Sequence, residues 1–142
     1  MATPGIAIRA FVIGDYDAAC ALWNAAEGIE ICEGDSRSEL GAYLERNPGL
    51  SCVAEENGAL VGAALCGHDG RRGLIYHLGV ATSARGRGVG RMLLQHCLNG
   101  WRAAGIKRAF ILVATDNSSG REFWIRNGWE SLSEAIPMAR DI

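Results

Sequence analysis

Six consecutive residues, Arg85-Gly86-Arg87-Gly88-Val89-Gly90, constrain the fold of this chain most strongly. The apolar run 74–81 before them predicts a strand. The residues after them carry a stripe of apolar side chains at helical spacing: Val89, Leu93, Cys97 and Trp101. Glycine at alternate positions lets a backbone take unusual φ values and approach a ligand closely. We therefore predict a glycine-rich loop between a strand and a helix.

A loop of this kind suits a phosphate group. The N–H groups at the start of a helix point in one direction, and the positive end of the helix dipole adds to their attraction for an anion. Arg85, Arg87 and Arg91 supply charge that can reach further phosphate oxygens. A loop that only connects two elements is the alternative. A nicotinamide or adenine nucleotide is disfavoured, because the third glycine of G-x-G-x-x-G is missing whether counting starts at Gly86 or at Gly88.

The N-terminal half predicts a strand, two helices and a hairpin. The first strand is expected over 6–12 and the first helix over 16–26, where apolar residues recur every three or four positions. Ser36, with a glutamate three residues later, predicts a capping box for a second helix that stops before Asn47-Pro48. Asn57-Gly58 suits a type I′ turn between strands over 50–56 and 59–67.

The C-terminal half predicts a crossover and a last helix. A continuous apolar run, 109–113, is typical of a buried strand, and its distance from the strand over 74–81 predicts a parallel β-α-β crossover. Ser118 or Ser119 is expected to cap a helix, and short strands are expected over 129–132 and 136–140. The predicted class is α+β, with a mixed, mostly antiparallel central sheet, about four helices and a single domain over 1–142.

Composition excludes several classes of function. The net charge is −2 and the basic residues are scattered, so a nucleic-acid groove is not expected. The first residues lack the pattern of a signal peptide, and no apolar stretch approaches 18 residues, so we expect a cytoplasmic protein without a membrane span. Five cysteines without a CxxC pair, and no paired metal-ligand spacing, predict reduced thiols and no metal site.

The motif R-x-x-G-x-G from Arg85 to Gly90 resembles the pyrophosphate motif of the GCN5-related N-acetyltransferases (the GNAT family). Leu78-Gly79-Val80 is similar to the family's strand end before that loop. Asn117, Phe123-Trp124 and Gly128-Trp129 resemble the family's later run in order and spacing. Chain length and short glycine-rich turns are similar to those of the small bacterial branch that includes YpeA-like proteins.

The resemblance implies an N-acetyltransferase that uses acetyl-CoA as the acyl-donor cosubstrate and lets an amine attack the thioester directly. It also implies a bulge in the fourth strand, which splays from the fifth and leaves backbone groups for the pantetheine arm. The residues that it places at the coenzyme are these: Leu78, Gly79, Val80, Arg85, Gly86, Arg87, Gly88, Val89, Gly90, Arg91, Asn117 and Trp124.

The family's usual acid and base are absent. Trp124 stands where many members have a tyrosine that protonates the thiolate, and an indole cannot give up a proton at useful pH. Leu74 and Leu112 stand where members with a glutamate base carry it. His77 and Tyr76 are the candidate catalytic residues nearby, with Tyr76 expected on the opposite face of the strand. Deprotonation through ordered water is a third option.

The acceptor is expected near the connection between the first two helices, which borders the acceptor site in this family. Four acids and no base lie there: Glu27, Glu30, Glu33 and Asp35. They suit a cationic amine, such as a polyamine-like molecule, an amino sugar or a protein N-terminus; a solvated acidic loop is the alternative. A module that binds acyl-CoA without turnover is the second functional hypothesis. Either a monomer or a homodimer is compatible with the sequence.

Overall fold

The computed structural model describes residues 5–26 and 28–142. The chain forms two compact units, Met1–Leu112 and Val113–Ile142, and each is described by itself. A single domain over 1–142 therefore remains a prediction.

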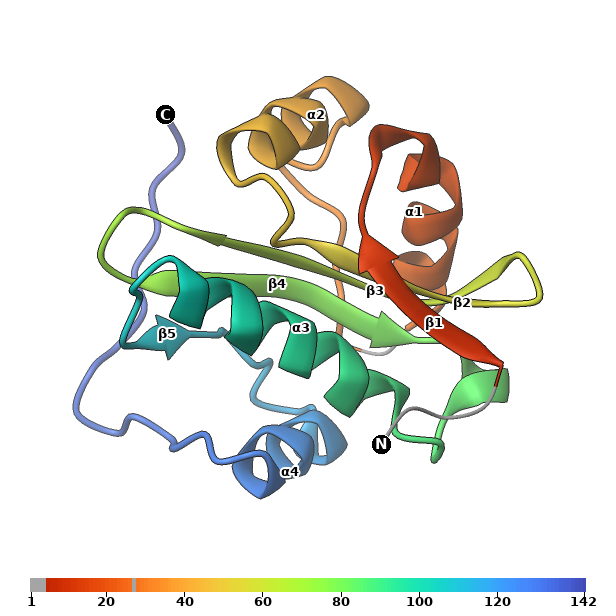
Figure 1. Cartoon of the computed structure of the whole chain (residues 1–142). Coiled ribbons are helices and arrows are strands. Elements are labelled where there is room, and N and C mark those ends of the chain that lie inside the picture. The colour runs from red at the N-terminus through yellow and green to blue at the C-terminus, as the bar shows by residue number, and fades with distance from the viewer. Residues whose placement is uncertain (1–4, 27) are drawn as a thin grey trace. The chain divides into compact units, whose positions relative to one another are not determined.

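The first unit is built on a five-stranded sheet in sequence order (Figure 1). Its strands are β1 (Ile6–Ala10), β2 (Cys52–Glu56), β3 (Ala59–His68), β4 (Gly73–Val80) and β5 (Ala109–Phe110). The first four strands pair antiparallel, and β4 pairs parallel to β5. The helix between β4 and β5 completes the predicted β-α-β crossover, and the mixed, mostly antiparallel sheet is confirmed.

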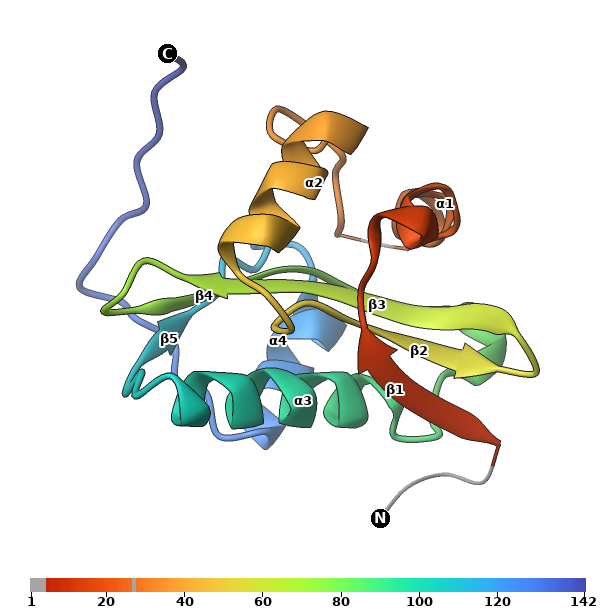
Figure 2. The ribbon, with the colours of Figure 1, turned by 45° about the horizontal axis from the view of Figure 1, so that its top comes forward.

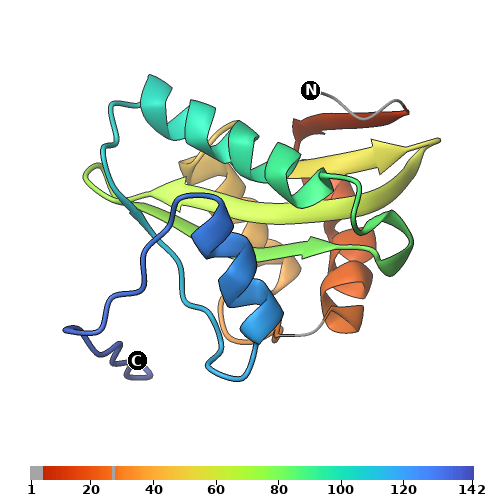
Figure 3. The same cartoon turned by 90° about the horizontal axis from the view of Figure 1, so that it is seen from below.

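Helices cover both faces of this sheet. The first unit has α1 (Tyr16–Ala25), α2 (Arg37–Arg46), α3 (Val89–Ala103) and two 3-10 helices, η1 (Ile13–Asp15) and η2 (Thr82–Ala84). Figure 2 shows α1 and α2 on one face of the sheet and α3 on the other. Figure 3 shows α3 crossing the near face, with α1 and α2 beyond the sheet. In the second unit, α4 spans Ser118–Arg126.

Local sequence signals explain most of these boundaries. The Ser36 hydroxyl accepts a hydrogen bond from the Glu39 N–H, and the Glu39 carboxylate accepts one from the Ser36 N–H, so the predicted capping box starts α2. Asn57 and Gly58 have φ values of 51° and 79°, which fit the predicted type I′ turn. Gly105, at φ 76°, follows α3 as its predicted C′ residue.

Two apolar cores lie against the two faces of the sheet. Seven buried residues form the core on the side of α1 and α2: Phe11, Ala19, Trp23, Leu40, Val53, Ala63 and Leu65. The predicted stripe of α3 is buried on the other side, with Val89, Leu93, Cys97 and Trp101 at most 3% exposed. All three cysteines of the strands and of α3 (Cys52, Cys66 and Cys97) are free and buried, as expected for small apolar residues.

The C-terminal predictions need correction. Within the described chain β5 covers only Ala109–Phe110 of the strand expected over 109–113, and residues 129–142 form no strand. The side chains of Ile136 and Met138 are 84% and 93% exposed, so no neighbouring strand covers them. Asn117, rather than a serine, caps α4: its Oδ1 accepts a hydrogen bond of 3.0 Å from the Gly120 N–H.

Candidate active site

The glycine loop turns sharply into α3. Gly86 and Gly88 have φ values of 75° and 79°, a region that L side chains rarely adopt. A Cβ atom at either position would meet no described atom within 4 Å, so conformation rather than crowding explains these two glycines. Gly88 is the N-cap of α3, and no side chain caps this end. An uncapped helix start with open space before it has the features of an anion site.

The loop arginines differ in their contacts. Arg87 forms an ion pair with Glu56 at the end of β2; its Nη1 donates to Oε1 over 3.1 Å, and the guanidinium lowers the pKa of that carboxyl. Arg85 is exposed and its Nε donates to the Val80 carbonyl oxygen over 3.4 Å. Arg91 is exposed on the first turn of α3. The ion pair with Glu56 therefore ties the glycine loop to the hairpin of β2 and β3.

Among the described residues, no strand pairs with one edge of β4 over most of its length. Its pairing with β5 is confined to Gly73 with Ala109 and Leu74 with Phe110, so the two strands separate beyond Leu74. The resemblance to the GNAT family implies this separation of the fourth strand from the fifth. Beyond Leu74, therefore, no residue of β4 has a register partner on β5.

A β-bulge interrupts β4 beside this free edge. Ala63 pairs with Gly79 and Leu65 pairs with Tyr76, so two residues of β4, His77 and Leu78, stand opposite Ala64 alone. The expected bulge is therefore present, with His77 in the left-handed region at φ 52°.

The bulge also changes which backbone groups face the free edge. The Gly73 N–H donates to the Arg108 oxygen beside β5 over 2.9 Å, whereas the Ala81 N–H donates to the Val61 oxygen on β3 over 2.8 Å. Gly73 begins β4 and Ala81 directly follows it, and both are odd-numbered, so the extra residue has reversed the alternation. The same alternation directs the N–H groups of Leu78 and Val80 away from β3.

The bulge overturns the prediction that Tyr76 and His77 lie on opposite faces. The Tyr76 ring meets the Tyr43 ring of α2, with centroids 6.5 Å apart, and the His77 ring meets Trp23 of α1 at 5.2 Å. Both side chains therefore lie on the face covered by α1 and α2. Burial raises the pKa of Tyr76, so its hydroxyl keeps its proton at neutral pH.

The fold brings His77 to Asp35, a residue of the segment between α1 and α2. His77 Nε2 lies 2.8 Å from Asp35 Oδ2, and the two side chains are only 15% and 10% exposed. The same oxygen accepts a hydrogen bond of 3.0 Å from the Cys32 N–H. The sequence singled out each residue separately, but nothing in it indicated that two residues 42 positions apart would pair.

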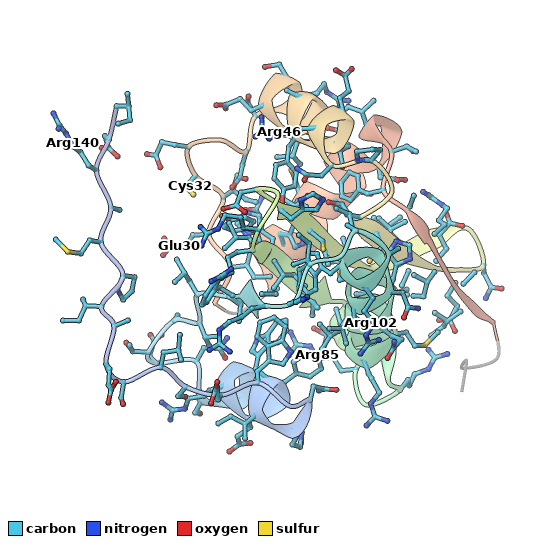
Figure 4. All side chains as sticks on the ribbon, turned by 60° about the vertical axis from the view of Figure 1, so that its left-hand side comes forward. Glu30, Cys32, Arg46, Arg85, Arg102 and Arg140 are labelled. Atoms are coloured by element: carbon cyan, nitrogen blue, oxygen red, sulfur yellow. The ribbon has the colours of Figure 1, made fainter. Side chains whose placement is uncertain are left out.

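The other acids of this segment differ from Asp35. Glu30 and Glu33 are exposed, and Glu27 lies outside the described residues. Figure 4 shows Glu30 and Cys32 on this segment, before α2 begins. Cys32 is an exposed residue. The loss of part of the water around its thiol, together with the negative charges of Asp35, Glu33 and Glu30, raises the pKa of that thiol. The segment is thus an acidic surface with one buried carboxylate beneath it.

Asn117 and Trp124 belong to the second unit. The Asn117 side-chain oxygen caps α4, and Trp124 is 8% exposed, with ring centroids 5.1 Å from Phe123 and 5.0 Å from Trp129. Their predicted contacts with the coenzyme stay predictions. Among the described residues no group of three His, Cys, Asp or Glu side chains could hold a metal ion, and no helix there is long and apolar enough to span a membrane.

The sequence and the fold of this chain are similar to those of known acetyltransferases. The model of the acetyltransferase (GNAT) family matches residues 16–129. The chain belongs to this family. An acetyltransferase of Pectobacterium atrosepticum is 33% identical over 112 residues, which are 79% of each chain, and one of Yersinia enterocolitica matches to the same extent. Membership makes this acetyltransferase an enzyme that uses acetyl-CoA as its acyl donor.

Solved structures confirm the fold of this GNAT protein. The structure of AAC(6')-Iy in complex with the bisubstrate analog CoA-S-monomethyl-acetylneamine matches with a TM-score of 0.76 at 16% identity, over 96% of this chain and 99% of that one. N-acetylglutamate synthase from Neisseria gonorrhoeae, complexed with coenzyme A and N-acetyl-glutamate, matches with a TM-score of 0.68 at 29% identity. That match covers 88% of this chain and 28% of the synthase.

Proposed function

We propose that this GNAT protein transfers the acetyl group of acetyl-CoA to a primary amine of a small molecule or peptide, by direct attack of the amine on the thioester. The observation that carries this proposal is the presence of three features in one unit: the uncapped start of α3, the free edge of β4 and the His77–Asp35 pair. A phosphate site, a strand edge and a proton acceptor are what such a transfer requires.

The pyrophosphate is held by the glycine loop. Positive φ at Gly86 and Gly88 opens the loop, and the space before both glycines lets a phosphate reach the N–H groups of Val89, Gly90 and Arg91. Arg85 and Arg91, both exposed, supply charge for further oxygens. Arg87 contributes mainly through Glu56, because that ion pair fixes the position of the loop.

The pantetheine arm lies along β4 in this proposal. The N–H groups of Leu78 and Val80 point away from β3 and have no β5 partner, so they can bond to amide groups of the arm as a neighbouring strand would. Gly79 presents its Cα to Leu22, Trp23 and Ile29 of the α1 side, which a side chain would crowd. Asn117 is proposed to bond near the pantetheine or the sulfur end of the coenzyme, and Trp124 is proposed to contact the coenzyme.

His77 and Tyr76 divide the proton transfers. His77 removes a proton from the attacking amine, since an imidazole is a suitable base near neutral pH. Tyr76 keeps its proton and suits a donor to the departing thiolate better than it suits a base. A thiol with a pKa of about 8.5 leaves without a strong acid, so we assign the larger rate effect to His77.

The acceptor is proposed to be a cationic amine. Glu30 and Glu33 are exposed on the segment that also carries Asp35, and a negative surface raises the local concentration of a positively charged substrate. Polyamine-like molecules, amino sugars and peptide N-termini share this charge. The surface therefore selects a charge class rather than one molecule.

Product analysis by mass spectrometry tests the proposal. Purified protein and acetyl-CoA are incubated with a polyamine, an amino sugar, a peptide with a free N-terminus and the same peptide with a blocked N-terminus and no lysine. We expect acetylation of at least one free amine and none of the blocked peptide. Acetyl-CoA binding with no acetylated product from any free amine would instead support a silent acyl-CoA-binding module.

A further inference from the structure

The imidazole of His77 is held by a carboxylate through one defined atom. Its Nε2 lies 2.8 Å from Asp35 Oδ2. An ionised carboxylate can only accept hydrogen bonds, so Nε2 must carry the proton. In the neutral ring Nδ1 then has the free lone pair, and Nδ1 is the atom that can accept a proton.

Asp35 is itself held in place from several sides. Its Oδ2 accepts the Cys32 N–H over 3.0 Å, and its backbone oxygen accepts the Tyr16 hydroxyl over 2.7 Å. The next residue, Ser36, is the N-cap of α2. The backbone of Asp35 is thus tied to α1 and adjoins the start of α2, and its carboxylate is held by the Cys32 N–H, so the side chain has little freedom to leave His77.

His77 is constrained as well. It is one of two described non-glycine residues with positive φ; the other, Asn57, lies in a hairpin turn where such values are common. The bulge at His77 turns its ring toward Trp23, at 5.2 Å between centroids, and toward Asp35. A non-glycine residue kept in this region is a recurring feature of functional sites.

We infer that Asp35 is a positioning residue, which holds His77 with its proton on Nε2 and so leaves Nδ1 as the proton acceptor for the amine. This inference rests on the proposed function, because it assigns a role to the base proposed there.

A double-mutant cycle separates this role from simple anchoring of the segment. The proteins are wild type, Asp35→Asn, His77→Gln and the double variant, assayed with the best amine from the product screen. Asparagine keeps the size of the side chain and an oxygen for the Cys32 N–H, but it removes the charge. Asp17→Asn is the control, since Asp17 is an acid on the surface of α1 whose side chain is 85% exposed.

We expect Asp35→Asn to lower kcat about tenfold to a hundredfold with an unchanged KM for acetyl-CoA, because general-base catalysis as a whole contributes about 10²–10⁴-fold. In the His77→Gln background the same substitution should have almost no effect on kcat, since Asp35 acts through His77. Asp17→Asn should behave as wild type. An equal loss from Asp35→Asn in both backgrounds would overturn the inference while leaving acetyl transfer established.

NMR of the histidine rings tests the pair without any activity. The chain has three histidines, and the His77→Gln variant identifies the His77 signals. We expect the neutral His77 ring of wild type to carry its proton on Nε2. A ring protonated on Nδ1 would overturn the inference even if the variants proved too unstable for kinetics. Failure of wild type to acetylate any amine would instead refute the proposed function.

Discussion

Gly88 and Gly105 provide a matched test of the glycine loop, because they flank the two ends of α3. Their φ values are 79° and 76°, and a Cβ at either would meet no described atom within 4 Å. A side chain in this left-handed region costs about 1–2 kcal/mol. Gly88→Leu and Gly105→Leu should therefore lose about the same stability, which for a chain of 142 residues lowers Tm by about 3–8 °C.

The two variants should differ only when acetyl-CoA is present. At about 100 times its Kd the ligand stabilises wild type by about 2.7 kcal/mol, and Gly105→Leu should gain the same. The leucine at Gly88 fills the space before the start of α3. If it raises Kd a hundredfold, the gain at the same concentration falls to about 0.4 kcal/mol. Thermal unfolding with and without acetyl-CoA measures both quantities, and equal ligand shifts in the two variants would refute the assignment of the loop.

Two further predictions concern charge and thiols outside the loop. Arg9 donates two hydrogen bonds of 2.8 Å to Asp15 and lowers the pKa of that carboxyl. Wild type should therefore be more stable than Asp15→Asn, with the full difference in unfolding free energy present above about pH 4. This difference should shrink as the pH falls through the lowered pKa that Asp15 has in the folded state. Denaturant unfolding at several pH values measures the difference, and a value that does not change with pH would contradict the ion pair. Cys32 is exposed whereas Cys52, Cys66 and Cys97 are buried, so alkylation of the folded protein should modify Cys32 and reach the buried three only in denaturant. Peptide mass mapping reads the sites, and rapid modification of the buried three would argue against this core.

Signals confined to a few neighbouring residues predicted the fold well. The capping box at Ser36, the turn at Asn57-Gly58 and the buried stripe of α3 are each set by local geometry, and all three are confirmed. The C-terminal strands failed because alternating side chains show only that a segment could pair. Ile136 and Met138 are exposed, and no strand of the described chain lies beside them to pair with.

The site was harder to predict because its geometry depends on one inserted residue. A bulge of this kind usually has glycine in the left-handed position, and His77 occupies it here, so the sequence carried no local sign of its location. The extra residue puts Tyr76 and His77 on the same face, where simple alternation placed them on opposite faces. Pairing with Asp35 depends on the tertiary fold and could not be read from spacing.

The most direct test of the account is an NMR titration of the labelled protein with acetyl-CoA, which follows every backbone amide at once. We expect the largest shift changes at Gly88, Val89 and Gly90 in the loop and at Leu78 and Val80 on the free edge of β4. Saturable changes at these amides would establish where the coenzyme binds. Changes confined to other parts of the chain, or none with acetyl-CoA in large excess, would contradict the assignment of the coenzyme to this loop and strand.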